Sequence, residues 1–130
     1  MRRLLDTSAY VWLKRGHDGV EESIRSAERV HVSIVVLGEL MSGIHDGAQF
    51  ERNVAEFNEF LAHPAVALEH LTTTTADRFG RIATELKRTG QPIPTNDVWI
   101  AAHAMELGAE VVTFDRHFQR VPGLVVRELV

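Results

Sequence analysis

The sequence predicts an α/β fold: a short, mainly parallel β-sheet flanked by helices, with helix the more abundant element. Two observations lead to this class. Apolar runs of about four residues stop at an acid, a glycine or a proline, which is typical of short buried strands. Longer stretches between them repeat their apolar residues at the spacing of a helix face. Parallel strands need such helices as crossover connections, so the two patterns agree.

Alternating strands and helices are expected in the first half of the chain. Leu4 and Leu5 form a buried run that stops at Asp6, and Val30 and Val32 bring β-branched residues to a second run. The predicted elements are a strand at Arg3–Asp6, a helix at Ala9–Lys14 capped by Thr7 and Ser8 and closed by Gly16, a helix at Val20–Ala27, a strand at Val30–Ser33, and a helix at Val35–His45 ended by Gly47.

The second half has clearer stop signals. Pro64 and Gly90 each follow a helical pattern, and Gly108 is typical of a helix C-terminus. The predicted elements are a helix at Gln49–His63, a strand at Val66–Leu68, a helix at Thr75–Thr89, a helix capped by Thr95 or Asn96 and running to Leu107, a strand at Val111–Phe114, and a strand at Leu124–Val126 after the Pro122-Gly123 turn.

Composition limits the class of protein. The 130 residues are expected to form a single domain, residues 1–130, and the absence of cysteine excludes disulfide scaffolds, thiolate zinc sites and cysteine nucleophiles. No apolar run approaches the roughly 20 residues of a membrane span, so we expect a cytoplasmic protein without a membrane partner. The net charge of −4 argues against a protein that coats nucleic acid, but not against a nuclease with an acidic pocket and basic rim.

Four acids lie at positions where α/β proteins often have ligand-binding or catalytic residues. Asp6 and Asp115 each fall at the C-terminal end of a predicted strand, and ligands bind beyond the carboxyl ends of parallel strands. Asp97 and Glu39 share helix faces with apolar or small residues. Each acid alone has an ordinary explanation as a cap or a surface residue. If all four converge, they must retain protons or bind a cation.

A pocket of carboxylates suits Mg²⁺ or Mn²⁺, which prefer oxygen ligands. Such an ion lowers the pKa of a bound water and stabilises the leaving oxygen of a phosphodiester. This is hydrolytic nuclease chemistry. A receiver domain of similar size and fold would need a lysine at a late strand end, but no lysine follows Lys87.

Other side chains that could take part in catalysis or binding have simpler structural interpretations. The seven histidines show no paired zinc-ligand spacing and are expected on the surface or in the core. Trp12 and Trp99 are expected to pack in the core or at an interface. Most basic residues are interpreted as solvated surface, with Arg116 the exception: because it follows Asp115, we expect it near the pocket and bound to a phosphate of the substrate.

Four segments in order resemble the PIN-domain ribonucleases, and more narrowly the VapC toxins of toxin–antitoxin pairs. They are Leu5-Asp6-Thr7-Ser8, Ser33 to Leu40 with Gly43 following, Pro94 to Ala102, and Val112 to Phe118. The resemblance covers essentially the whole chain. It implies a PIN-like three-layer sandwich and a metal-dependent endoribonuclease that leaves a 5′-phosphate and a 3′-hydroxyl.

The resemblance also implies roles for individual residues. Asp6, Asp97 and Asp115 would hold the metal, with Glu39 completing the site and orienting the attacking water. The supporting residues implied or suggested beside them are Thr113, Ser8 and Asn96. One or two ions, Mg²⁺ or Mn²⁺, fit this expectation.

The expected partners are an RNA substrate, a second copy of the chain in a homodimer, and a small VapB-type antitoxin. The alternative is a non-catalytic PIN-like binding or scaffold domain, whose signature would be the loss of one of the four acids; all four are present.

Overall fold

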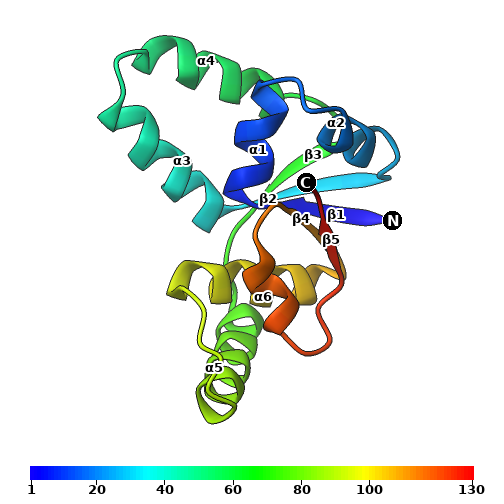
Figure 1. Ribbon diagram of the computed structural model, residues 1–130. Helices are drawn as coiled ribbons and strands as arrows, with labels where there is room; N and C mark the ends of the chain where they lie inside the picture. The colour runs from blue at the N-terminus through cyan, green and yellow to red at the C-terminus, as the bar shows by residue number, and fades with distance from the viewer.

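Five parallel strands form the centre of the structure, a computed structural model that describes all residues from Met1 to Val130 (Figure 1). Their order across the sheet is β3-β2-β1-β4-β5. The strands are β1 (Arg2–Leu5), β2 (Arg29–Ser33), β3 (Val66–Glu69), β4 (Glu110–Thr113) and β5 (Val126–Glu128). All four pairings are parallel, which confirms the predicted α/β class.

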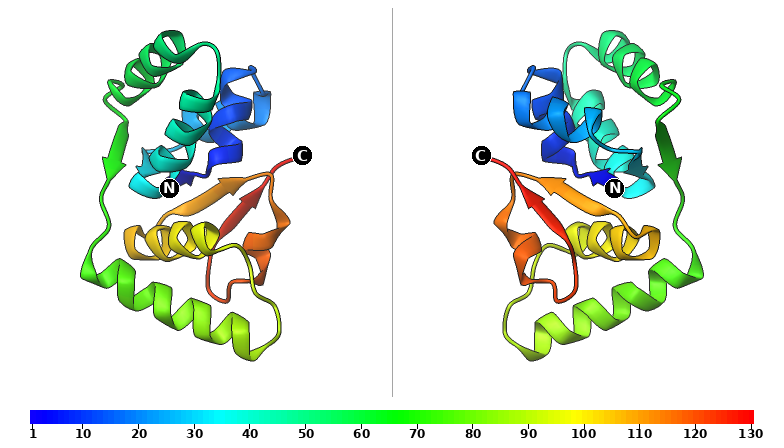
Figure 2. Two further views of the ribbon diagram at one scale, coloured as in Figure 1. Left: turned by 90° about the vertical axis from the view of Figure 1, so that its left-hand side faces the viewer. Right: turned by 90° about the vertical axis from the view of Figure 1, so that its right-hand side faces the viewer.

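Helices cover both faces of the sheet and give three layers (Figure 2). One face carries α1 (Thr7–Lys14), α2 (Asp18–Arg25), α3 (Ile34–Asp46) and α4 (Phe50–Leu61). The other face carries α6 (Thr95–Leu107), with α5 (Thr73–Arg88) packed outside it and a 3₁₀ turn, η1 (Arg116–Arg120), beside it. None of these helices combines the length and apolarity needed to span a bilayer.

The strand order reverses at β1. The chain moves from β1 outward through β2 to β3, and then returns to place β4 on the other side of β1. Ligands of open α/β sheets bind at such a switch point, beyond the carboxyl ends of the two neighbouring strands. Asp6 directly follows β1, and Asp115 lies two residues beyond Thr113, the last residue of β4, so the topology brings these two acids together.

The core holds these two strands firmly. Leu4 and Leu5 of β1 pair with Val111 and Val112 of β4, and each of the four is at most 1% exposed. Phe118 of η1 is also fully buried and anchors the segment that follows Asp115. The chain therefore leaves both strands from a rigid base.

Several predicted boundaries and caps were wrong in detail. Asp6, not Thr7 or Ser8, is the N-cap of α1, because its carboxylate accepts a hydrogen bond from the Ala9 N–H. At α6 the N-cap is Pro94, which offers no side-chain cap, so neither Thr95 nor Asn96 has that role. The last strand begins at Val126 rather than Leu124.

Candidate active site

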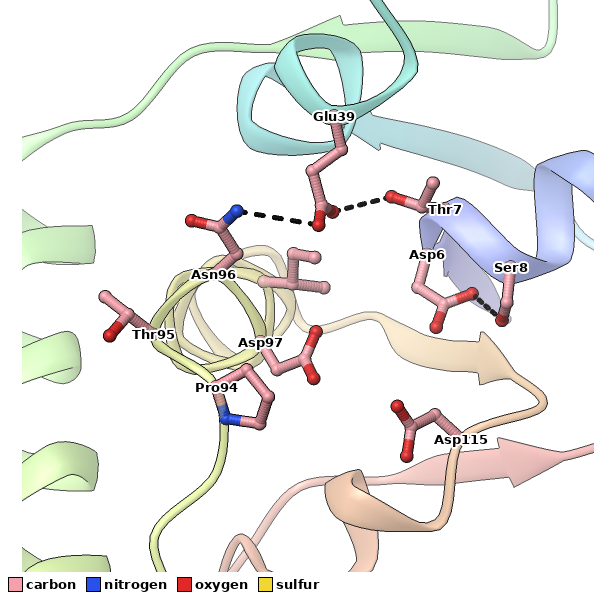
Figure 3. A pocket seen from close by; sticks show the side chains of 10 residues that line it. Asp6, Thr7, Ser8, Glu39, Pro94, Thr95, Asn96, Asp97 and Asp115 are labelled. Carbon is pink, nitrogen blue, oxygen red and sulfur yellow. Dashed lines mark hydrogen bonds between the residues drawn. The ribbon is translucent and has the colours of Figure 1, made fainter. Parts of the chain in front are cut away.

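An open pocket of about 500 Å³ lies at the switch point, with β1, β4, α3 and α6 around it (Figure 3). All four acids predicted as site residues line it, and no lysine or arginine does. The complete lining is Asp6, Thr7, Ser8, Glu39, Pro94, Thr95, Asn96, Asp97, Ile100 and Asp115. Segments distant in the sequence thus converge on one acidic space.

Asp6 is the most deeply buried of the four carboxylates. It is 5% exposed, and its Oδ1 accepts hydrogen bonds from the Ala9 N–H at 2.8 Å and the Ser8 hydroxyl at 2.7 Å. Its Oδ2 accepts a hydrogen bond from the Thr113 hydroxyl at 2.5 Å. Burial raises the pKa of Asp6, while these three donors act in the opposite direction. The carboxylate is therefore fixed in orientation before any ligand arrives.

Thr113 and Ser8 connect the ends of the two central strands. The Thr113 hydroxyl accepts a hydrogen bond from the Asp115 N–H at 2.9 Å while donating to Asp6. The Ser8 hydroxyl likewise accepts from the Phe114 N–H at 3.2 Å. Both predicted supporting hydroxyls thus lie between Asp6 and the segment that carries Asp115, and they set the distance between these acids.

Asp97 lies in the first turn of α6 and faces Asp115. Ligand atoms of Asp97, Asp115 and His117 lie within 4.8 Å of one another. The His117 Nδ1 is 3.0 Å from Asp115 Oδ1 and 3.6 Å from Asp97 Oδ2, yet it is buried and makes no hydrogen bond of acceptable geometry. These three residues form a group with the spacing and the donor atoms of a cation site.

Glu39 reaches the pocket from α3, across from Asp6 and Asp97 (Figure 3). Its Oε1 accepts a hydrogen bond from the Thr7 hydroxyl at 2.6 Å. Its Oε2 lies at a longer 3.5 Å from the Asn96 side-chain amide, the third predicted supporting residue. Glu39 is therefore held by neutral donors and has no cationic partner in the pocket.

The electrostatics of the pocket are those of crowded like charges. Burial, together with repulsion from Asp115, Glu39 and Asp6, raises the pKa of Asp97 to about 6, and the nearby His117 opposes this shift only in part. The pocket would thus gain free energy from a bound cation. Carboxylate oxygens and a buried imidazole nitrogen without a hydrogen-bond partner fit a divalent metal ion.

Two residues differ from the sequence analysis. Arg116 is not in the pocket lining: its side chain is 90% exposed, and its nearest acidic partner is Glu128 at 3.8 Å. His117, interpreted from sequence as an ordinary surface or core histidine, instead joins the acidic group. Thr7, the donor to Glu39, was also missed. Its position directly after Asp6 was the one available signal, because Thr7 begins α1 next to that acid.

A parallel sheet with this strand order, joined to an acidic pocket at its switch point, defines the class of protein. The chain belongs to the PIN-domain family, whose model matches residues 3–124. Within that family its relatives are VapC ribonucleases. Ribonuclease VapC2 of Haemophilus influenzae is 32% identical over 95% of both chains. The tRNA(fMet)-specific endonuclease VapC of Salmonella typhimurium is 31% identical over 98% of both.

Solved structures agree with the sequence comparisons. The VapBC complex of Salmonella typhimurium, bound to DNA, contains a chain that matches with a TM-score of 0.88 at 30% identity over 98% of both chains. VapBC2 of Rickettsia felis, bound to a promoter DNA fragment, matches with a TM-score of 0.88 at 25% identity over the full length of both. The PIN-like three-layer fold expected from the resemblance is therefore confirmed.

Proposed function

We propose that this chain is a metal-dependent endoribonuclease and the toxin of a type II toxin–antitoxin pair. The single observation that carries the proposal is the convergence of Asp6, Glu39, Asp97 and Asp115 on one pocket without a lysine or arginine in its lining. Hydrolysis at this pocket would leave a 5′-phosphate and a 3′-hydroxyl.

The proposed metal ligands are Asp6, Asp97, Asp115 and Glu39, directly or through water, and the position of His117 adds a fifth candidate. The oxygen-rich donor set favours Mg²⁺ or Mn²⁺, and an imidazole nitrogen is more compatible with Mn²⁺ than with Mg²⁺. When bound, the ion would activate water and stabilise charge on the phosphate oxygens.

The protein's own groups would orient the reaction. Asp6 is held rigidly by Ser8 and Thr113, so its carboxylate oxygens have fixed positions in the pocket. The Thr7 hydroxyl orients the Glu39 carboxylate, which suits it to accept a hydrogen bond, or a proton at Oε2, from the attacking water. Asn96 would limit rotation of the same carboxylate.

The proposed partners follow from charge and from the relatives. Related structures are VapBC complexes, so we propose a VapB-type antitoxin for this chain. We also propose that the toxin is a homodimer. An arginine or lysine of the antitoxin would complement the acidic pocket and exclude both metal and substrate. We propose the cytoplasm as the site of action, where RNA is the substrate.

Cleavage by the purified chain tests the proposal. RNA should be cut in the presence of Mn²⁺ or Mg²⁺, and EDTA or the Asp6→Asn substitution should stop it. The matched control is Asp77→Asn on α5, an exposed acid that pairs only with Arg81 and lies outside the pocket. Initiator tRNA belongs in the substrate panel, because the Salmonella relative is named for it.

Two outcomes would contradict the proposal. Equal cleavage by wild type and Asp6→Asn would indicate a contaminating nuclease. Metal binding without any RNA cleavage would instead support the alternative, a non-catalytic PIN-like binding domain. Expression of the chain alone should slow growth if it is a toxin, and co-expression of the gene encoded beside it should restore growth.

A further inference from the structure

His103 is a buried titratable side chain that lies outside the acidic pocket. It is on α6 and only 1% exposed, in a stretch of the helix that is otherwise apolar. Its Nδ1 is 2.8 Å from the hydroxyl of Ser33, which is itself fully buried. A polar pair at this depth is stable only because each group satisfies the other.

Ser33 has a second contact that is compatible with its hydroxyl donating to His103. It is the last residue of β2 and the N-cap of α3, where its hydroxyl oxygen accepts a hydrogen bond from the Val35 N–H at 3.1 Å. The hydroxyl proton is then available to His103, whose Nδ1 can accept it as a neutral imidazole. Burial lowers the pKa of His103, which agrees with a neutral ring.

This hydrogen bond joins the two helices that carry two of the site acids. Glu39 lies six residues after Ser33 on α3, and Asp97 lies six residues before His103 on α6. At 1.5 Å per residue, each acid is about 9 Å along its helix from the contact. A small rotation of α3 relative to α6 at this contact would therefore change the separation of the two carboxylates.

We propose that His103 is a positioning residue, which holds the start of α3 against α6 through Ser33 and so sets the distance between Glu39 and Asp97. The inference rests on the proposed function and identifies a residue that determines its catalytic geometry. His103 itself touches neither substrate nor metal.

A second contact on the same helix provides a control for stability. Glu106, one turn after His103, accepts hydrogen bonds from the hydroxyls of Thr72 and Thr75 at the start of α5. Thr75 is fully buried, as Ser33 is. This contact fixes α6 to α5, which carries none of the four acids. Loss of either contact should destabilise the fold, but only loss of the Ser33 contact should move Glu39.

The test compares two amide substitutions at one position. In His103→Asn the amide lies as many bonds from Cβ as Nδ1 does, so it can still accept from Ser33. In His103→Gln the amide instead reaches the place of Nε2. Thr75→Val serves as the stability control, and Ser33→Ala removes the hydrogen bond from the other side. For each variant, the free energy of unfolding, the Mn²⁺ dissociation constant, and kcat and KM for RNA are measured.

We expect kcat to fall about tenfold in His103→Gln, with KM within about twofold, because a small misplacement of a catalytic group is costly. His103→Asn should keep kcat within about twofold of wild type, and so should Thr75→Val despite its lower stability. Mn²⁺ should bind several-fold more weakly to His103→Gln than to His103→Asn. Ser33→Ala should lower kcat at least as much as His103→Gln does, because it also removes the N-cap of α3. The double variant should lose no more than Ser33→Ala alone.

Equal loss of kcat in His103→Asn and His103→Gln, or in Thr75→Val, would overturn the inference and leave His103 a merely structural residue. Should one His103 variant fail to fold, Ser33→Ala against Thr75→Val decides by the same measurements. If the wild type itself cleaves no RNA, the proposed function fails. In that case the Mn²⁺ dissociation constants of the variants still test whether His103 positions Glu39.

Discussion

The two ends of α6 shift the pKa of a carboxylate in opposite directions. Near its N-terminus, Asp97 faces other acids, and burial together with their repulsion raises its pKa to about 6. Near its C-terminus, desolvation would raise the pKa of Glu106 as well, but hydrogen bonds from Thr72 and Thr75, together with nearby basic groups that include Arg78, lower the pKa. Neighbouring groups offset the burial of Glu106, whereas they add to the effect of burial on Asp97.

The difference separates a structural carboxylate from one that we propose to be functional. Glu106 stabilises the fold by accepting neutral donors, whereas Asp97 costs stability as long as no cation is bound. Perturbed acids in a pocket are typical of functional sites for this reason. Substitution of Asp97 should therefore lower activity whereas substitution of Glu106 should not, and the two should have opposite effects on the stability of the metal-free protein.

The largest expected effect is on cleavage. Asp97→Asn removes a proposed metal ligand and should lower RNA cleavage by about a thousandfold, since a bound metal ion contributes several kcal/mol to such reactions. Glu106→Gln should leave kcat within about twofold. The measurement is the rate of cleavage of a defined RNA at saturating Mn²⁺. Comparable losses in both variants would remove the functional distinction between the two ends of α6.

Metal binding should give the next largest effect. A ligand present at 100 times its dissociation constant stabilises the folded state by about 2.7 kcal/mol, so Mn²⁺ should raise the Tm of the wild type by several degrees. Glu106→Gln should show the same shift from a lower starting Tm, and Asp97→Asn should show almost none. Thermal unfolding with and without EDTA measures this. An undiminished shift in Asp97→Asn would place the metal elsewhere.

The four acids of the candidate site and the fold class could be predicted from the sequence. Asp6 and Asp115 were predictable because a short apolar run fixes where a strand ends, and parallel strands end at the same edge. Asp97 and Glu39 were predictable because helical spacing placed them on apolar or small-residue faces. The fold class followed from the same two periodicities.

The remaining features depend on the directions in which side chains point, and the spacing of apolar residues does not encode these directions. Arg116 and His117 are consecutive, yet the turn of η1 directs His117 to the acids and Arg116 to solvent. The N-cap of α6 at Pro94 was missed because Thr95 and Asn96 are better capping residues by type. The contact of His103 with Ser33 joins residues 70 positions apart, which spacing along the chain does not reveal.

In the metal-free protein, Asp97→Asn and Glu106→Gln should change the free energy of unfolding by smaller amounts and in opposite directions. Asp97→Asn removes a charge that folding disfavours and should stabilise the metal-free protein by about 1–2 kcal/mol at pH 7, at 1.36 kcal/mol per pKa unit and with allowance for partial exposure. Glu106→Gln weakens two hydrogen bonds to a charged acceptor and should destabilise it by about 1–2 kcal/mol. Urea unfolding in EDTA measures both.

The pH dependence provides the internal control for this prediction. Because the pKa of Asp97 is raised by folding from 3.8 to about 6, its ionisation disfavours the folded state fully above pH 6, and the penalty fades as the pH falls through that value. The metal-free wild type should therefore gain stability from pH 7 to pH 5. Asp97→Asn should lose most of this gain, and an unchanged profile would contradict the assigned cause.

Arg116→Ala should have the smallest effect of all. The sequence placed this residue on RNA phosphate, whereas its side chain is exposed and directed toward Glu128, outside the pocket. An exposed arginine of this kind acts on nucleic acid through long-range charge, so its loss should raise KM about two- to threefold at low salt, reduce the salt slope by about one, and leave kcat unchanged. Cleavage kinetics across a salt series measure this. A fall in kcat would show instead that Arg116 turns toward the reacting phosphate when RNA binds, and the basic rim expected from the sequence would then begin at the edge of the acidic pocket.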